Sequence, residues 1–335
     1  MKNISAIIYI LLITLNANAR KTYGVVEFSA NYMREQPSYT AELGNQSLMG
    51  TVVEILDEKG YWLKIKSPEP YTAWVNEKGV VKMSEEEIDN YIKEPKYICV
   101  SPYSKIYSSP SLKAEIISDL VMGNILRQWR SSFGLEGSNF FVPIKKRGFV
   151  GVVTPSGKKG YVIAKDVQTL RMWADKSHSS AENLIETAKL FLGVPYMWGG
   201  ASIKGVDCSG LTRMVWFMNG VLIPRDAGPQ SRCGDEVRIF KADGSLDLQV
   251  LRPGDLVFFG EKAEGGQAER VSHVGIYIND GIFIHSSQVV RINSLRPSDK
   301  NYYAKTPIKA RRYIGAEGRD GLIKMTESPL YFPQN

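Results

Sequence analysis

The chain has 335 residues, with 42 Lys and Arg against 35 Asp and Glu, and 43% of its residues are apolar. At about 150 residues per domain this length predicts two or three compact units, and the composition excludes a largely disordered or collagen-like chain. The three Cys and three His include no Cys-x-x-Cys pair and no His-Glu-x-x-His motif, which argues against a disulfide scaffold, a zinc ribbon and a zincin. We therefore expect neither a metal nor a cofactor.

The first residues have the pattern of a secretory signal. Lys2 precedes an apolar stretch from Ile4 to Leu15, and Ala17-Asn18-Ala19 supplies the small-x-small pattern of a cleavage site. The apolar run is about half of the roughly 20 residues that a bilayer span needs, so it predicts a signal peptide over residues 1–19 rather than an anchor. We expect a periplasmic or extracellular mature chain that begins near Arg20 and has no membrane anchor.

Basic groups occur in clusters, including Lys145-Lys146-Arg147 and Arg311-Arg312. We interpret them chiefly as solvated faces, with attraction to an anionic cell-wall polymer as the alternative. No nucleic-acid-binding motif is present, and the expected export argues against a nucleic-acid partner.

Two successive segments have the alternating pattern of short β-strands, one from Val25 to Val81 and one from Tyr97 to Leu170. Leu48-Met49-Gly50 matches Val121-Met122-Gly123 at an offset of 73, and Trp74-Val75 matches Tyr161-Val162 at an offset of 87, so the second copy has 14 extra residues. This predicts an internal duplication, with barrels over residues 20–82 and 96–172. Ser84-Glu85-Glu86-Glu87 predicts a capped helix in the linker over residues 83–95.

The remaining residues, 173–335, have a mixed pattern. Ser179-Ser180-Ala181-Glu182 predicts a capping box, and the helix after it ends before Gly193. A second amphipathic helix follows Asp207, and apolar segments at 256–259, 271–278 and 282–286 predict strands. Helices followed by an antiparallel sheet predict an α+β domain.

Cys208 is the candidate nucleophile. Asp207 is placed to cap a helix, so Cys208 lies in its first turn, where unpaired N–H groups and the helix dipole favour the thiolate. Its neighbours are Asp, Ser and Gly rather than apolar residues. Cys99 and Cys233 are interpreted as structural, and a disulfide between them stays open.

The imidazole partners are expected in a β-hairpin, where His273 lies on one strand and His285 on the next. If Asp280-Gly281 were a two-residue loop, paired residue numbers would sum to 561 and the two His would point to opposite sides of the sheet. A three-residue loop from Asn279 to Gly281 gives a sum of 560 and makes the two His diagonal neighbours, about 7–8 Å apart at Cα. We predict the three-residue loop.

Together these residues have the Cys-His-polar arrangement of a nucleophilic hydrolase. His273 accepts the thiol proton, His285 orients His273, and the Cys208 N–H contributes to an oxyanion hole. His178 is interpreted as a surface residue.

Several motifs in one order resemble the NlpC-type cell-wall cysteine peptidases, whose catalytic domain is papain-like. They cover about 150 residues: Tyr196-Met197-Trp198-Gly199-Gly200, Asp207-Cys208-Ser209-Gly210, Leu251-Arg252-Pro253-Gly254-Asp255-Leu256 and Ser272-His273-Val274-Gly275-Ile276-Tyr277. Each N-terminal copy resembles a bacterial SH3-like barrel. The resemblance therefore implies two all-β barrels followed by an α+β papain-like domain, as in γ-D-glutamyl-L-diamino acid endopeptidases.

The same resemblance implies cleavage of murein peptides between D-Glu and a diamino acid when the N-terminal L-Ala is free. In that family the first barrel covers one end of the groove, and acidic and Tyr groups capture the terminal ammonium. The positions that match substrate-contacting motif residues are Asp207, Ser209, Trp198, Tyr71, Glu42 and Asp226. The residues by themselves leave open which barrel lines the groove and which diamino acid is preferred.

Three alternatives remain at this point. One is a general autolysin that acts on intact wall. A second is a wall-binding protein with a silent third domain, against which the intact Cys208, His273 and His285 set argues. A third is thioester-based acyl transfer, which export and the paired barrels disfavour. We expect a monomer.

Overall fold

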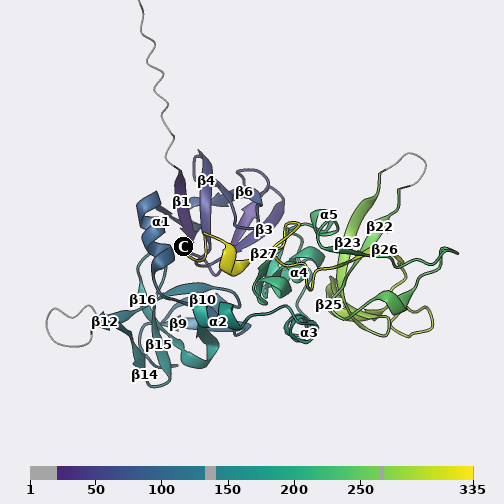
Figure 1. The fold of residues 1–335 in the computed structure, drawn as a ribbon. Helices are drawn as coiled ribbons and strands as arrows, with labels where there is room; N and C mark the ends of the chain where they lie inside the picture. Colours follow the sequence, from purple (N-terminus) through teal and green to yellow (C-terminus); the bar gives the residue numbers. More distant parts are fainter. Residues whose placement is uncertain (1–20, 133–140, 264–267, 335) are drawn as a thin grey trace, which may run out of the picture.

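The computed structural model describes residues 21–132, 141–263 and 268–334, and the predicted signal peptide over residues 1–19 lies outside them. Figure 1 shows two β units followed by a mixed domain, with α4 (Cys208–Phe217) between the barrels and the large sheet. This is the predicted fold class. Among the described residues no helix combines the length and the apolar character that crossing a bilayer requires.

The first barrel has seven strands in the order β3-β2-β6-β5-β4-β1-β7. Alternate residues of these strands, including Met33, Val53 and Ile65, fill its core because successive side chains of a strand point to opposite faces. The elements are β1 (Thr22–Val26), β2 (Ala30–Arg34), β3 (Leu43–Leu48), β4 (Val52–Lys59), β5 (Trp62–Lys66), β6 (Thr72–Asn76), η1 (Glu77–Gly79) and β7 (Val80–Met83).

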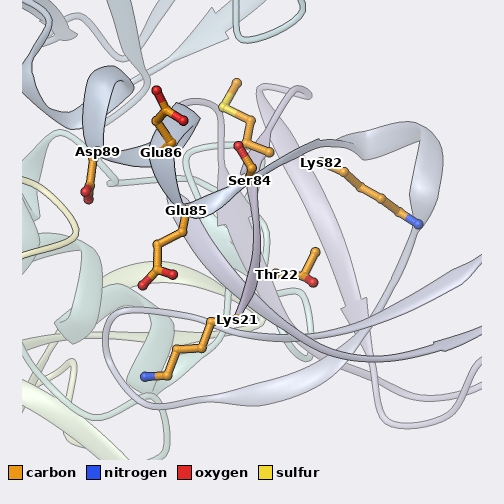
Figure 2. A pocket seen from close by; sticks show the side chains of 8 residues that line it. Lys21, Thr22, Lys82, Ser84, Glu85, Glu86 and Asp89 are labelled. Atoms are coloured by element: carbon orange, nitrogen blue, oxygen red, sulfur yellow. The ribbon is translucent and has the colours of Figure 1, made fainter. Parts of the chain in front are cut away.

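The linker helix α1 (Glu85–Lys93) is fixed at both ends. Ser84 and Glu87 form the predicted capping box at its start. At its end the buried Lys96 ammonium donates to the carbonyls of Ile92 and Glu94, at 3.0 and 2.9 Å. A hollow of about 740 Å³ adjoins the start of this helix (Figure 2), and its lining includes no Cys or His, so it is not a candidate catalytic site.

The second barrel repeats the first, because its strand order β10-β9-β16-β15-β11-β8-β17 matches strand for strand. This confirms the predicted duplication. Its elements are β8 (Lys96–Cys99), β9 (Tyr103–Tyr107), β10 (Ile116–Val121), β11 (Ile125–Gln128), β12 (Arg130–Ser132), β13 (Phe141–Pro143), β14 (Lys145–Lys146), β15 (Phe149–Val153), β16 (Lys159–Ile163), η2 (Ala164–Asp166) and β17 (Val167–Thr169).

A hairpin inserted next to β15 accounts for the extra length of the second copy. The Ile144 N–H donates to the Trp129 carbonyl at 2.9 Å and closes the base of this hairpin, whose stem pairs β12 with β13. Residues 130–143 between those two positions are the 14 extra residues. The first barrel has no counterpart, because β4 continues directly into β5 there.

The two barrels meet at the turns that first revealed the repeat. Gly50 and Gly123 both have left-handed backbones, with φ of 84° and 90°. A Cβ on Gly50 would collide with the Ile125 carbonyl, and one on Gly123 would lie 2.8 Å from Leu48, so glycine permits the close contact on both sides.

The mixed domain has a six-stranded sheet in the order β21-β26-β22-β23-β24-β25, and helix α4 packs on β23. Helix α2 spans the predicted boundary between residues 172 and 173, so the chain enters this domain without a break. The elements are α2 (Leu170–Lys176), α3 (Ala181–Lys189), β18 (Ala201–Ser202), β19 (Gly205–Val206), α4, β20 (Val221–Leu222), α5 (Ala227–Gln230), β21 (Asp235–Val237), η3 (Leu248–Val250), β22 (Leu256–Glu261), β23 (Arg270–Asn279), β24 (Ile282–Ser287), β25 (Val289–Ser294), β26 (Pro307–Arg312), β27 (Ile323–Lys324) and η4 (Met325–Glu327).

The predicted capping box at the start of α3 is wrong by one residue. Ser180, not Ser179, is the N-cap, and its hydroxyl accepts from the Asn183 N–H. The Ser179 hydroxyl instead donates to the Glu317 carboxylate, which ties the start of α3 to the C-terminal segment. A tertiary contact therefore decides between two adjacent serines that the local pattern could not separate.

Candidate active site

Cys208 is the first residue of α4 and is 7% exposed. The Asp207 carboxylate accepts from the Gly210 N–H at 2.7 Å and caps the helix as predicted. The backbone N–H groups of Val274 and Ser209 lower the pKa of the Cys208 thiol, against the larger effect of burial, and α4 packs on β23. Because Val274 directly follows His273, the nucleophile lies beside the strand that carries the imidazole.

The predicted stabilisation of a thiolate does not hold for the resting protein. Burial, with a smaller effect from the Asp207 charge, raises the pKa of Cys208 to about 11, although the N–H groups of Val274 and Ser209 act in the opposite direction. Burial also lowers the pKa of His273 to about 3. The unliganded pair is therefore a neutral thiol beside a neutral imidazole, because desolvation outweighs the helix dipole here.

The hairpin that carries both His has the predicted register but not the predicted loop. Asn279 pairs with Ile282, so the turn is the two-residue Asp280-Gly281, with left-handed φ of 45° and 77°. A β-bulge at Ile278 then shifts the pairing by one, and Tyr277 lies opposite Phe283. Two-residue turns of this type suit the twist of paired strands, which is why the extra residue enters the strand instead.

This register brings the two imidazoles together, with His273 Nε2 2.6 Å from His285 Nδ1. His285 Nε2 lies 2.9 Å from the Asn293 Oδ1, and the Asn293 amide donates to the Asn301 carbonyl at 2.6 Å. The Asn301 carbonyl can only accept, so the Asn293 NH2 group must point to it and the Asn293 Oδ1 must face His285. His285 Nε2 therefore donates to Asn293, and in the neutral ring His285 Nδ1 accepts. His273 then carries its proton on Nε2 and keeps a lone pair on Nδ1, as a general base requires.

Tyr303 covers this pair of imidazoles. Its ring centroid lies 4.8 Å from that of His285 and 5.8 Å from that of His273. The charge of a Cys208 thiolate contributes to the raised pKa of Tyr303, after burial, so the sulfur, His273 and Tyr303 occupy one site. The structure thus assembles Cys208, His273 and His285 and adds Asn293 and Tyr303, which the sequence analysis did not single out.

Asp207 and Ser209 hydrogen-bond to other residues of the protein. The resemblance had implied that they contact the substrate. The buried Arg225 guanidinium donates to the two Asp207 carboxylate oxygens at 3.0 and 2.6 Å and to the Ser209 hydroxyl at 3.0 Å. The Gly199 N–H adds a further bond to Asp207 at 2.9 Å. These two side chains therefore position the nucleophile helix and leave little capacity for a ligand.

The first barrel contacts residues that surround the nucleophile. Its Asn45 side chain accepts from Arg225 at 2.8 Å, and its Gln46 accepts from the Ala201 N–H at 2.9 Å. Gly44 lies at the same place, where a Cβ would meet the Tyr71 hydroxyl and displace it.

Tyr71 and Asp226 lie together at this junction. Burial and the Asp226 charge raise the pKa of Tyr71 to about 12, so its hydroxyl stays protonated. Arg225 is already paired with Asp207, and partial burial raises the pKa of Asp226. Glu35 and Glu42 of the first barrel are both exposed, and of the two only Glu35 is among the charges that raise the pKa of Tyr71, after burial and Asp226. Glu35 follows β2, and its N–H donates to the Glu42 carbonyl at 3.0 Å. The acid expected from the sequence and the acid that acts on Tyr71 are therefore directly opposite each other in the first barrel.

The remaining singled-out residues lie in these places. Trp198 is 61% exposed and leaves its ring available to a ligand. Cys99 and Cys233 are buried free thiols, so the open question of a disulfide between them is answered in the negative. His178 is exposed and hydrogen-bonds near the start of α3. Within the described ranges no group of three or more His, Cys, Asp or Glu is close enough to hold a metal ion.

A helix-borne cysteine, a histidine on the adjacent sheet and a polar residue on the next strand define a papain-like cysteine peptidase. The NlpC/P60 family model matches residues 193–312, and the bacterial SH3 domain model matches residues 29–81. The chain belongs to the NlpC/P60 family.

Relatives support this assignment over most of the chain. A protein of Bacillus cereus named gamma-D-glutamyl-L-lysine dipeptidyl-peptidase is 32% identical over 82% of this chain and 76% of its own length. A protein of the same name from Bacillus subtilis is 26% identical over 83% of this chain and 86% of its own length. A crystal structure of an NlpC/P60 family protein from Bacillus cereus aligns with a TM-score of 0.68 and 26% identity, covering 87% of this chain and 99% of that one.

Proposed function

We propose that this protein is an exported cysteine peptidase that removes L-Ala-γ-D-Glu from murein peptides whose amino terminus is free, by hydrolysing the bond to the diamino acid. The observation that carries this proposal is that the Asp226 charge, after burial, raises the pKa of Tyr71, so the two groups lie near each other where the first barrel contacts the peptidase domain. A partly buried carboxylate whose neighbouring guanidinium, that of Arg225, is already paired with Asp207 suits an ammonium group. The names of the relatives from Bacillus cereus and Bacillus subtilis agree with it.

The chemistry follows from the hydrogen-bond chain. His273 Nδ1 accepts the Cys208 thiol proton while the sulfur attacks the γ-carbonyl carbon of D-Glu. The Cys208 N–H and the hydroxyl of Tyr196, whose pKa burial and then the charge of a Cys208 thiolate raise to about 12, are the donors for the oxyanion. His273 then protonates the leaving amine, and water hydrolyses the thioester to regenerate the thiol. Because His273 is neutral and carries its proton on Nε2, it can take the Cys208 proton during the attack. A thiolate–imidazolium pair in the resting enzyme is therefore not needed.

Ammonium capture makes the enzyme selective for released peptides, because an L-Ala that is still joined to the glycan has no free amine. The experiment incubates the mature chain with L-Ala-γ-D-Glu-diaminopimelate, its N-acetylated form and whole sacculi, and identifies the products by mass spectrometry. We expect cleavage of the free-amine peptide alone. Equal cleavage of the acetylated peptide would refute ammonium capture, and release of peptides from sacculi would favour the autolysin alternative.

Catalysis by Cys208 is tested in the same assay. Cys208→Ala should abolish turnover, whereas Cys99→Ala should retain it because Cys99 is buried in the second barrel. Turnover by the Cys208 variant would refute the nucleophile. Export rests on residues 1–19, and fractionation of cells that express the full chain tests it by locating the shortened product.

A further inference from the structure

The second barrel carries the whole excess of positive charge. Residues 96–172 hold twelve Lys and Arg against four Asp and Glu, whereas the rest of the chain holds thirty against thirty-one. The first barrel, over residues 20–82, holds eight of each sign. Two modules with the same strand order therefore present different electrostatic surfaces, and the fold itself does not require this difference.

The acids of the second barrel do little to offset its charge. The Asp119 carboxylate is paired with the Lys204 ammonium of the peptidase domain at 2.6 Å. Asp166 is buried and accepts from the Ser104 hydroxyl at 2.7 Å. These two carboxylates hold domains and turns together, and among the described residues neither forms an ion pair with a lysine of the barrel.

Three consecutive basic residues lie directly after the inserted hairpin. Lys145 and Lys146 form β14, and Arg147 occupies the following turn with a left-handed φ of 52°. All three are exposed, and the ion pairs of the described part of this barrel involve other residues, namely Arg127, Arg171 and Asp119. The exposed Lys165 adjoins this turn, because the preceding N–H, that of Ala164, donates to the Gly148 carbonyl at 2.9 Å.

Apolar surface adjoins this charge. A pocket of about 520 Å³ between the three basic residues has Tyr97, Pro143 and Phe149 in its walls. On the stem of the inserted hairpin the Phe141 ring is 46% exposed, with the Arg130 guanidinium 5.9 Å from its centroid. Cations around an exposed aromatic ring suit an interface between water and hydrocarbon, where the charges meet headgroups and the ring lies at their level.

We propose that this surface docks the enzyme on an anionic phospholipid bilayer. We call it the basic face and define it as Arg130, Phe141, Lys145, Lys146, Arg147 and Lys165. A polyanionic polymer would match the charges but would give the exposed Phe141 ring no partner, which favours the lipid surface. In Figure 1 β12 and β14 lie at the opposite side of the molecule from β22, β23 and β26, so docking leaves the peptidase domain accessible. This contact is peripheral and needs no membrane-spanning segment.

The test is co-sedimentation of the mature full chain with vesicles of phosphatidylcholine alone and with phosphatidylglycerol added. We expect binding only to the anionic vesicles and its loss at high salt. The triple variant K145A/K146A/R147A should reduce the partition coefficient roughly a hundredfold, since each basic residue contributes near an anionic surface. Phe141→Ser, which keeps the charge, should weaken binding several-fold.

A matched control removes the same charge elsewhere through K59A/K66A/K241A, three exposed lysines outside the basic face. It should bind vesicles like the wild type, and peptidase activity on a soluble peptide should be unchanged in every variant, which reports correct folding. Equal binding to neutral vesicles, equal loss in the control, or wild-type binding by the triple variant would overturn the proposal. Binding of soluble polyphosphate without binding to vesicles would overturn it in favour of a polymer site.

Discussion

Arg213 on α4 and Glu69 in the loop between β5 and β6 form an ion pair in which both side chains are almost completely buried. The pair joins the nucleophile helix to the first barrel. Tyr71 follows Glu69 by two residues, so the contact that holds the two units together also fixes the position of a proposed substrate ligand. A buried pair of this kind determines geometry more than it adds stability.

Removal of one partner of this pair should be costly. Arg213→Met leaves the Glu69 charge buried without a partner, and we expect the free energy of unfolding to fall by about 3–5 kcal/mol in urea titrations. The double variant R213M/E69L should recover most of this loss but raise KM, because Tyr71 loses its support. The exposed pair Arg171–Asp175 is the control, and Arg171→Met should cost less than about 1 kcal/mol. Equal losses in both single variants would contradict this account.

Asn293 should act on turnover rather than on substrate binding. Asn293→Ala leaves the His285 N–H without its acceptor, so the tautomers of His285 and His273 are no longer fixed. We expect kcat to fall about tenfold with KM unchanged, which corresponds to the loss of one buried hydrogen bond. Asn293→Asp still accepts and should retain most of kcat. Its charge should raise the imidazole pKa, so the acid limb of the kcat profile should move to higher pH. Wild-type kcat in Asn293→Ala would refute the role of Asn293 in fixing the tautomers of His285 and His273.

Alkylation should report a protonated thiol. Because burial raises the pKa of Cys208 to about 11, the thiolate fraction and the rate of modification by iodoacetamide should rise about tenfold per pH unit from pH 7 to 10. Peptide mapping distinguishes Cys208 from the two structural thiols. A plateau below pH 8 would instead indicate a preformed ion pair with His273.

Asp226 should control the acid limb of kcat/KM. A carboxylate binds ammonium only when it is ionised, and the pKa of Asp226 is raised above 3.8, so affinity should fall as the pH decreases through that raised pKa. Asp226→Asn should remove this limb and raise KM about tenfold to a hundredfold, as expected for a lost charged hydrogen bond. Glu35→Gln should weaken binding, whereas Glu42→Gln should not. Weaker binding in Glu42→Gln but not in Glu35→Gln would instead support Glu42, the residue expected from the sequence.

The sequence was sufficient for features that depend on local pattern. The strand repeat, the Asp207 cap and the common face of His273 and His285 all follow from spacing and alternation. It was insufficient where tertiary contacts compete. The raised pKa of Cys208 depends on burial, and Arg225 gives no sign in the chain that it will occupy Asp207 and Ser209. The bulge at Ile278 shows that a correct register can arise from a different loop.

The turns at Gly50 and Gly123 bring the two barrels into contact, Gly50 against Ile125 and Gly123 against Leu48, yet each barrel makes different bonds with the peptidase domain. The first barrel is the copy whose Asn45 side chain accepts from Arg225, the partner of Asp207 beside the nucleophile. The second barrel makes no bond to Arg225 among the described residues, and its added hairpin and altered charge are the kind of divergence that duplication permits when one copy supports the site.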